Sequence, residues 1–435
     1  MIGLNEWNTL LTEWGYAALD LLIQPFYYMA VLFMFLYYLR QTAAERRLIH
    51  VKLHSPGAEL WRSLWSGLLA GLGVSAAGAA LGISLSSAGV AAIWIVSLLL
   101  LLLRVRAFCF AYAAGTLGVL QFVLSFFPDA RLPGWGGELL QAVRDLDIPA
   151  LVVLAGLLHL AEALLARLQG PSLATPLYLE GKRGRTVGGY RLDAFWPVPL
   201  FLLIPAGSAA GELPWPTLLG GGLGLVSLPV VIGYSDWTTG RLPRVKAARV
   251  FGRLLLYAAA LVVLGLGAAW WGPLTLPAAL AALLLHEGLV WLGAREERRS
   301  SPFFVDPQHG LKIMAVLPAS PADELGVQPG EILVRVNGMP VTGRAQLHEA
   351  LRLNPAYCKL EVLNAAGESK YLQRPIYDGD HHQLGVILAP LPDEDVTVPE
   401  KAPSLPAVVA LRTGARRRGR TEAEPAAQEH GSAEA

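Results

Sequence analysis

The chain divides by its hydrophobic pattern into a long apolar part and a shorter part in which apolar and polar residues alternate. A bilayer core about 30 Å thick is crossed by about 20 apolar residues in a helix. The stretches that fit this length are Gly15–Leu39, Leu64–Ile83, Val90–Leu103, Ala107–Phe127, Ile148–Ala166, Thr217–Tyr234, Leu254–Trp271 and Leu274–Ala294. Phe195–Ala209 is shorter and contains three prolines, so it is predicted as a broken or re-entrant span. The pattern therefore predicts a multi-pass α-helical membrane bundle of seven to nine spans over residues 1–299.

Basic residues follow every second predicted span, and they set the expected orientation. The loop between Arg40 and Arg62 is basic, as are the segments Arg241–Arg253 and Arg295–Arg299, whereas Ser84–Gly89 carries no charge. Lys and Arg accumulate in the cytoplasmic loops of membrane proteins. We therefore expect a protein of the cell membrane in which everything after Arg295 is cytoplasmic. An odd number of spans would place the N-terminus outside.

Composition supports this division of the chain. Asp, Glu, Lys and Arg make up 16% of the chain, against about 25% in soluble proteins. The deficit is confined to residues 1–294, of which about 12% are charged, while about 25% of the remainder are charged. This excludes a wholly soluble enzyme and a disordered chain. The net charge of +1 predicts no general attraction to nucleic acid.

The part after residue 300 has the strand and turn pattern of a small α+β domain. The expected strands are 310–316, 331–336, 357–363, 370–376 and 384–388. Ser320 is expected to cap a short helix that Gly326 ends, and 346–353 is a second amphipathic helix. Asn337-Gly338 is the preferred pair for a two-residue hairpin turn.

A motif that runs from the short helix through the second strand to the turn after it resembles the bacterial PDZ family. It reads Ser320-Pro321-Ala322, then Gly326-Val327, Gly330-Glu331-Ile332-Leu333 and Val336-Asn337-Gly338. Glu331 stands where the family usually has Asp, and Leu325 where it usually has Ala. The resemblance implies a cytoplasmic PDZ domain over residues 300–390, a β-sandwich or partly open barrel with two helices. Residues 391–435 are rich in Pro, Ala and Glu and are predicted to be a disordered tail.

A PDZ domain binds an extended peptide, usually a C-terminus, at a sheet edge beside a helix. The expected carboxylate-binding loop is Leu384, Gly385, Val386 and Ile387, which fits if the domain is permuted. An alternative loop is His309, Gly310 and Leu311. The helix residues expected to face the groove are Leu347, His348 and Leu351, although the apolar ones could equally belong to the core.

Small and polar residues within the predicted spans offer further candidate sites. Gly67, Gly71 and Ser75 begin a small-residue spacing that favours close packing, either inside the bundle or in a homo-oligomer. His159 and Glu162 share one helix face at membrane depth. They are interpreted as two polar side chains that pair with each other inside the bundle, or as part of a proton or ion path.

Two catalytic patterns are incomplete. His286-Glu287 begins the zinc-peptidase pattern, but Val290 stands where the second histidine ligand is needed. Gly233-Tyr234-Ser235-Asp236 lacks the glycine that follows a serine nucleophile. We therefore expect no enzymatic activity, no cofactor and no metal.

The layout of a multi-pass bundle followed by one cytoplasmic PDZ domain resembles the MinJ family of cell-division topology proteins. This resemblance implies a scaffold that interacts with DivIVA and MinD and positions division proteins at septum and poles, next to the lipid bilayer. Two alternatives stay open: a PDZ-containing adaptor or regulator of a membrane protease, and a transporter with an appended PDZ module. A transporter would show repeats with interrupted spans.

Overall fold

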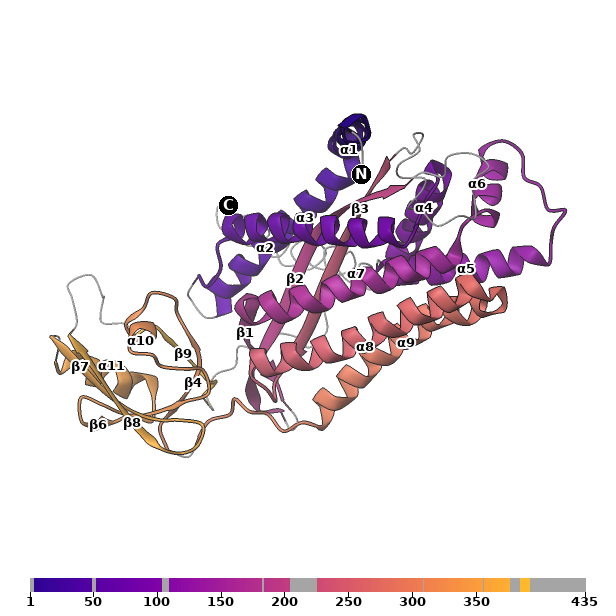
Figure 1. Cartoon of the computed structure of the whole chain (residues 1–435). Coiled ribbons are helices and arrows are strands. Elements are labelled where there is room, and N and C mark those ends of the chain that lie inside the picture. The colour runs from indigo at the N-terminus through magenta and orange to yellow at the C-terminus, as the bar shows by residue number, and fades with distance from the viewer. Residues whose placement is uncertain are drawn as a thin grey trace, which may run out of the picture.

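The structure is a computed structural model that describes residues 4–48, 52–103, 109–181, 184–203, 225–307, 309–354, 356–375 and 384–391. An elongated, mainly helical body is joined at one end to a smaller, strand-rich domain (Figure 1). All but the first residue of the predicted tail lies outside the described residues.

The body is built from long helices. They are α1 (Leu4–Ile23), α2 (Pro25–Leu48), α3 (Pro56–Ala80), α4 (Ser87–Leu103), α5 (Phe110–Ser125), α6 (Trp135–Arg144), α7 (Ile148–Gln169), α8 (Pro243–Trp270) and α9 (Thr275–Arg299). Proline begins several of them, at a position where its missing N–H has no helical partner to lose. Pro25 also separates α1 from α2, and the two helices meet at a bend of 59°.

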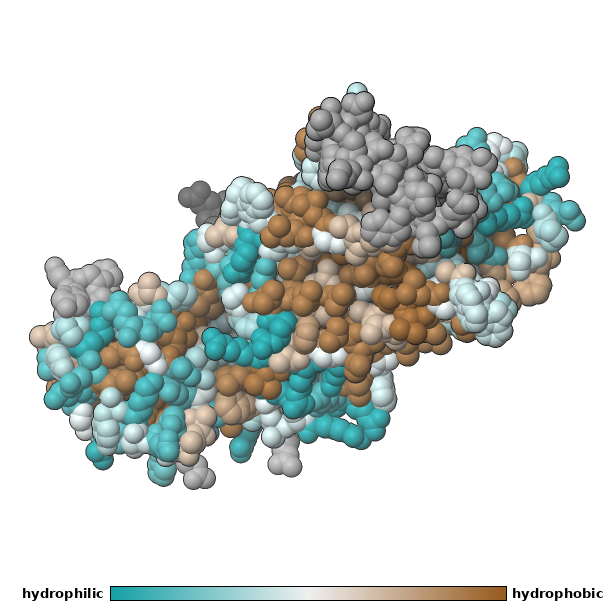
Figure 2. All heavy atoms as spheres, in the orientation of Figure 1, coloured by the Kyte–Doolittle hydropathy of each residue, from teal (hydrophilic) through white to brown (hydrophobic). Residues whose placement is uncertain are grey.

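Apolar helices dominate this body. Among the described residues, four helical segments have the length and composition to cross a membrane: Pro56–Ala80, Ile148–Leu173, Pro243–Trp270 and Gly272–Arg299. The bent pair α1–α2 adds a fifth if it counts as one span, while α4 and α5 are apolar but shorter. Figure 2 shows a broad hydrophobic band over this body, in contrast to the more hydrophilic small domain.

Two predicted spans are strands, and these predictions were wrong. The body contains an antiparallel sheet of β1 (Ala174–Glu180), β2 (Thr186–Leu203) and β3 (Leu225–Thr238), in that order. It includes the described parts of Phe195–Ala209 and Thr217–Tyr234. Nearly every residue of β2 is buried, so its apolar run is not broken by alternating polar residues. Such a run has the same pattern as a buried helix.

The prolines of β2 lie where a strand tolerates them. The Phe201 N–H points away from β3 and donates to Ser75 Oγ of α3 at 2.9 Å. Pro199 and Pro197 lie two and four residues before Phe201, so their backbone nitrogens face the same side of β2. Their missing N–H groups therefore cost no hydrogen bond with β3.

The small residues of α3 pack against this edge of β2. A Cβ atom added at Gly67 or Gly71 would overlap the carbonyl oxygen of Pro197 or Pro199, respectively. The predicted close packing is thus confirmed inside the chain, but the partner is a strand rather than a second helix.

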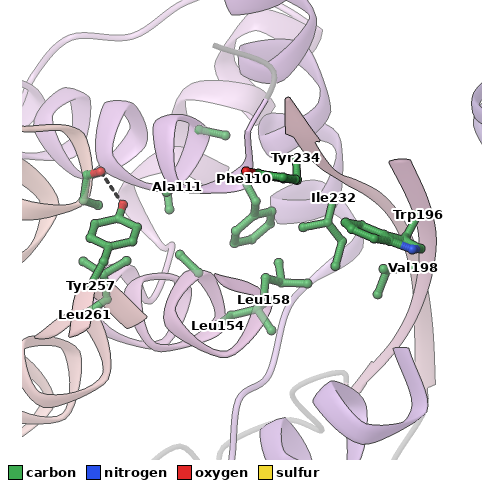
Figure 3. Packing of buried hydrophobic residues seen from close by; sticks show 14 of the residues in the cluster. Phe110, Ala111, Leu154, Leu158, Trp196, Val198, Ile232, Tyr234, Tyr257 and Leu261 are labelled. Carbon is green, nitrogen blue, oxygen red and sulfur yellow. Dashed lines mark hydrogen bonds between the residues drawn. The ribbon is translucent and has the colours of Figure 1, made fainter. Parts of the chain in front are cut away.

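The core of the body lies between this sheet and the helices. Figure 3 shows Leu154 and Leu158 of α7 between Trp196 and Val198 of the sheet and Tyr257 and Leu261 of α8. Leu154, Leu158, Trp196 and Val198 are fully buried. Helix α7 therefore holds the sheet and the α8–α9 pair together.

The small domain has the predicted elements. They are β4 (Leu311–Val316), α10 (Pro321–Glu324), β5 (Ile332–Val336), β6 (Met339–Pro340), α11 (Arg344–Arg352), β7 (Tyr357–Leu363), β8 (Ser369–Pro375) and β9 (Val386–Leu388). The strand order is β8-β7-β5-β4-β9, with β6 paired to β5. Ser320 accepts the predicted capping bond from the Asp323 N–H. Asn337 and Gly338 form the predicted turn, with φ of +50° and +84°.

The small domain is seated directly on the β1–β2 hairpin of the body. The Gly188 N–H donates to the Phe304 carbonyl at 2.8 Å, and the Tyr190 hydroxyl donates to the Met314 carbonyl. A Cβ at Gly188 would lie 2.6 Å from Met314 Sδ and 2.8 Å from Phe304 Cβ. Glycine at this position therefore permits the close approach of the two parts.

Candidate functional site

The candidate site is the edge of β9, the last strand of the small domain's sheet. The Ala389 N–H donates to the Lys312 carbonyl, and the Gly385 carbonyl accepts from Leu317, each at 2.8 Å. These odd-numbered residues point their backbone groups at β4. Because the direction alternates along a strand, the backbone groups of Val386 and Leu388 point away from β4. An added peptide strand would pair with this side.

The loop before β9 is tied through its carbonyls to the chain between Leu317 and Ala322. The Leu384 carbonyl accepts from the Ala322 N–H at 2.9 Å, in addition to the Gly385 contact. Gly385 has φ of +77°, and a Cβ there would overlap Ser320. Both observations explain why this position is glycine.

The side chains predicted to line the groove separate into two groups. Leu384, Val386, Leu347 and Leu351 join one apolar cluster of the small domain, with both α11 leucines buried. The two α11 leucines thus belong to the core of the small domain. His348 is exposed at the surface of α11.

Ile387 is directed to the other face of β9. Its side chain belongs to the core cluster of the body, which also contains Phe304 and Met314. Ile387 therefore holds the small domain on the body, on the opposite face from the α11 leucines.

The alternative loop lies elsewhere in the domain. Gly310 is buried with φ of +87°, and its Cβ position is 2.7 Å from the Leu333 carbonyl oxygen. Leu311 is buried and paired with Leu333. His309 is exposed. This segment faces β5, so the structure does not place it at the edge of β9.

A residue of the body reaches the edge of β9, and sequence reasoning missed this contact. The Tyr178 hydroxyl of β1 donates to the outward-facing Leu388 carbonyl at 3.0 Å. Arg344, the first residue of α11, donates to the same hydroxyl at 3.0 Å. Tyr178 therefore bridges β9 and α11. No local pattern could have indicated this contact, because 210 residues separate Tyr178 from Leu388.

The predicted intramembrane pair has more neighbours than the sequence indicated. His159 Nε2 lies 3.7 Å from a Glu162 carboxylate oxygen and 3.3 Å from Cys109 Sγ. One ligand atom from each of Cys109, His159 and His286 lies within 4.8 Å of the other two. His286 was considered with its sequence neighbours alone, and its true neighbours come from other helices.

Comparison with known proteins supports the domain prediction and extends it to the whole chain. The family model for the PDZ domain matches residues 312–363. The cell division topological determinant MinJ of Bacillus subtilis is 28% identical over 406 residues, which cover 89% of this chain and 98% of MinJ. The chain is similar to MinJ along nearly its whole length. A probable MinJ of Lacticaseibacillus paracasei is also 28% identical, over 80% of this chain and 91% of its own.

The similarity to proteases is limited to a small part of the chain. The putative serine protease HhoA of a Synechocystis strain is 30% identical over 81 residues, which are 19% of this chain and 18% of HhoA. These matches concern the PDZ domain only. The resemblance to MinJ is thus confirmed, and the protease similarity reflects the shared binding module.

Proposed function

We propose that the chain is a non-enzymatic membrane scaffold that positions cell-division proteins through its PDZ groove. The observation that carries this proposal is the alignment with MinJ, a division determinant, over 98% of that relative's length. Because the similarity includes the body as well as the PDZ domain, it concerns the whole layout rather than a widespread module.

The groove would act by strand addition. A partner's C-terminal segment would pair with the Val386 and Leu388 backbone along β9, its last side chain resting on Leu347 and Leu351. Its carboxylate would bind the N–H groups around Gly385. Apolar helices confine the domain to the membrane surface, where the effective concentration of a membrane-bound partner is raised. Modest affinity for the peptide is then sufficient.

The proposed side and partners follow from charge and resemblance. Arg249 and Arg253, which belong to the basic cluster expected on the cytoplasmic side, form ion pairs with Glu296 near the end of α9. The PDZ domain follows α9 at this same end, so we place it in the cytoplasm (Figure 1). By resemblance to the MinJ family, the proposed partners are DivIVA and MinD.

Imaging of a fluorescent fusion of the full chain in a rod-shaped host tests this function. We expect enrichment at the septum and poles, because a scaffold for division proteins must be where they act. A uniform signal around the envelope, from a fusion shown to be intact and membrane-inserted, would contradict the proposal.

A further inference from the structure

Three helices of the body bring metal-binding side chains to one point. Cys109 precedes the first residue of α5, His159 lies in α7 and His286 lies in α9. Their candidate ligand atoms are all within 4.8 Å of one another, and His159 Nε2 is 3.3 Å from Cys109 Sγ. Ligands of a tetrahedral zinc ion, at bond lengths near 2.0–2.3 Å, are about 3.3–3.6 Å apart. A small closing movement would therefore complete this geometry.

Both histidines are held in the form that ligates a metal through Nε2. His159 Nδ1 lies 2.7 Å from the Ala155 carbonyl, to which it can only donate. The Tyr112 hydroxyl donates its single proton to Glu287, so His286 Nδ1, 3.1 Å from that hydroxyl, donates in turn. These bonds leave a lone pair on each Nε2. Metal-bound histidines are commonly oriented in this way by a second hydrogen bond.

Glu162 is not one of the three clustered residues but lies next to His159, so it would have to approach the other two side chains to become a fourth ligand and balance the charge. Its side chain is buried, and its carboxylate lies 3.7 Å from His159 Nε2, which is too long for a hydrogen bond. Within the described part of the chain, no side chain or backbone group donates a hydrogen bond to it. A buried carboxylate without such bonds is costly. With a doubly charged cation, a thiolate and a carboxylate, the site would be neutral.

We propose that Cys109, His159, His286 and Glu162 bind one Zn²⁺ ion. The mixture of one sulfur, two imidazole nitrogens and one carboxylate oxygen suits zinc, which accepts all three ligand types. With Glu162 drawn in as the fourth ligand, no position on the ion would stay open, so it would be a structural ion that joins the N-terminal end of α5 to α7 and α9. The Tyr257 ring stands at right angles to the His159 ring, with 4.9 Å between centroids, and encloses the site.

Metal loading of the purified full chain in lipid nanodiscs tests this site. We expect about one Zn²⁺ per chain after incubation and desalting, and a clear rise in unfolding temperature. Loaded with Co²⁺ instead, the chain should show the thiolate-to-metal absorption and the strong visible bands of tetrahedral cobalt. Cys109→Ser and His286→Gln should each weaken Zn²⁺ affinity by about tenfold or more.

The chain contains a matched control, because its other cysteine lies in the PDZ domain. Burial raises the pKa of Cys358 to about 11 and keeps it a thiol. Cys358→Ser should therefore retain the metal and the cobalt–thiolate absorption. The proposal is overturned if wild-type chain binds no Zn²⁺, if it binds Cu(I) but not Zn²⁺, or if the thiolate absorption survives Cys109→Ser. Serine is nearly the same size as cysteine, so Cys109→Ser should fold normally. An unfolding temperature equal to that of the metal-free wild type shows that it has folded.

Discussion

A single hydroxyl group, that of Tyr178, connects β9 and α11 of the small domain to the body of the protein. It occupies the Leu388 carbonyl, which is one of the backbone groups that an added peptide strand would use. Arg344 holds the same hydroxyl from the side of α11. If a peptide adds to β9 as proposed, the hairpin would therefore compete with it for one hydrogen bond.

Removal of this hydroxyl should strengthen peptide binding. In Tyr178→Phe the Leu388 carbonyl is free for the ligand, and a net hydrogen bond is worth about 1 kcal/mol, or about fivefold in affinity. Fluorescence anisotropy with labelled C-terminal peptides of the host's DivIVA and MinD, on full chain in nanodiscs, measures this. Tyr371→Phe, at an exposed site on β8, should leave the affinity unchanged. Unaltered or weaker binding in Tyr178→Phe would show that the contact does not compete.

The residues of the groove could be predicted only where the signal was local. Gly385 was assigned from its neighbours in the sequence, and its positive φ and its contact with Ser320 account for the glycine. Ile387 was grouped with the loop although it faces the body, because strand alternation does not reveal what covers the second face. Its role as a peptide-binding residue stays a prediction.

Packing of α3 on β2 leaves no room for a side chain at two of the helix's glycines. An added methyl at Gly71 would overlap the Pro199 carbonyl, whereas Gly73 has nothing within 4 Å of its Cβ position. The two glycines belong to the same helix and differ in what they face. They therefore form a matched pair for experiment.

Gly71→Ala should destabilise the protein, and Gly73→Ala should not. Forcing a methyl into a packed contact typically costs about 1–3 kcal/mol. The exposed substitution should be neutral or stabilising by up to about 1 kcal/mol, because alanine favours a helix over glycine. Thermal unfolding in detergent, followed by tryptophan fluorescence, compares the two. Equal stability of both variants would contradict the described α3–β2 contact.

At the scale of elements, the sequence pattern located the apolar segments more reliably than it distinguished helices from strands. The seven predicted spans other than the two strands are mainly helical in their described residues, although Gly15–Leu39 is interrupted by the bend between α1 and α2. For β2, the alternating prolines at 197 and 199 were interpreted as a broken helix, although they fit a strand whose one side receives no partner strand. Burial of both faces removed the alternation that distinguishes a strand.

At the scale of the whole molecule, the sequence pattern predicts features that neighbouring residues specify, but not contacts between distant segments. The PDZ domain was predicted closely because its caps, turns and strands are specified by neighbouring residues such as Ser320 and Asn337. The convergence of Cys109 and His286 and the docking of Phe304 on Gly188 join segments more than 100 residues apart. Such contacts depend on the packing of the entire chain, so no sequence motif predicts them.

The most direct test of the central claim is peptide affinity of the full chain for C-terminal segments of DivIVA and MinD. Each peptide is compared with a free and with an amidated C-terminus. Each is measured on the wild-type chain, on Val386→Arg, and on the control Tyr371→Arg, which lies at the opposite edge of the sheet. We predict binding of at least one free-carboxylate peptide, weakened about tenfold or more by amidation or by Val386→Arg but not by Tyr371→Arg. If neither peptide binds, or if amidation and Val386→Arg leave the affinity unchanged, the β9 edge is not the site at which this protein captures division partners.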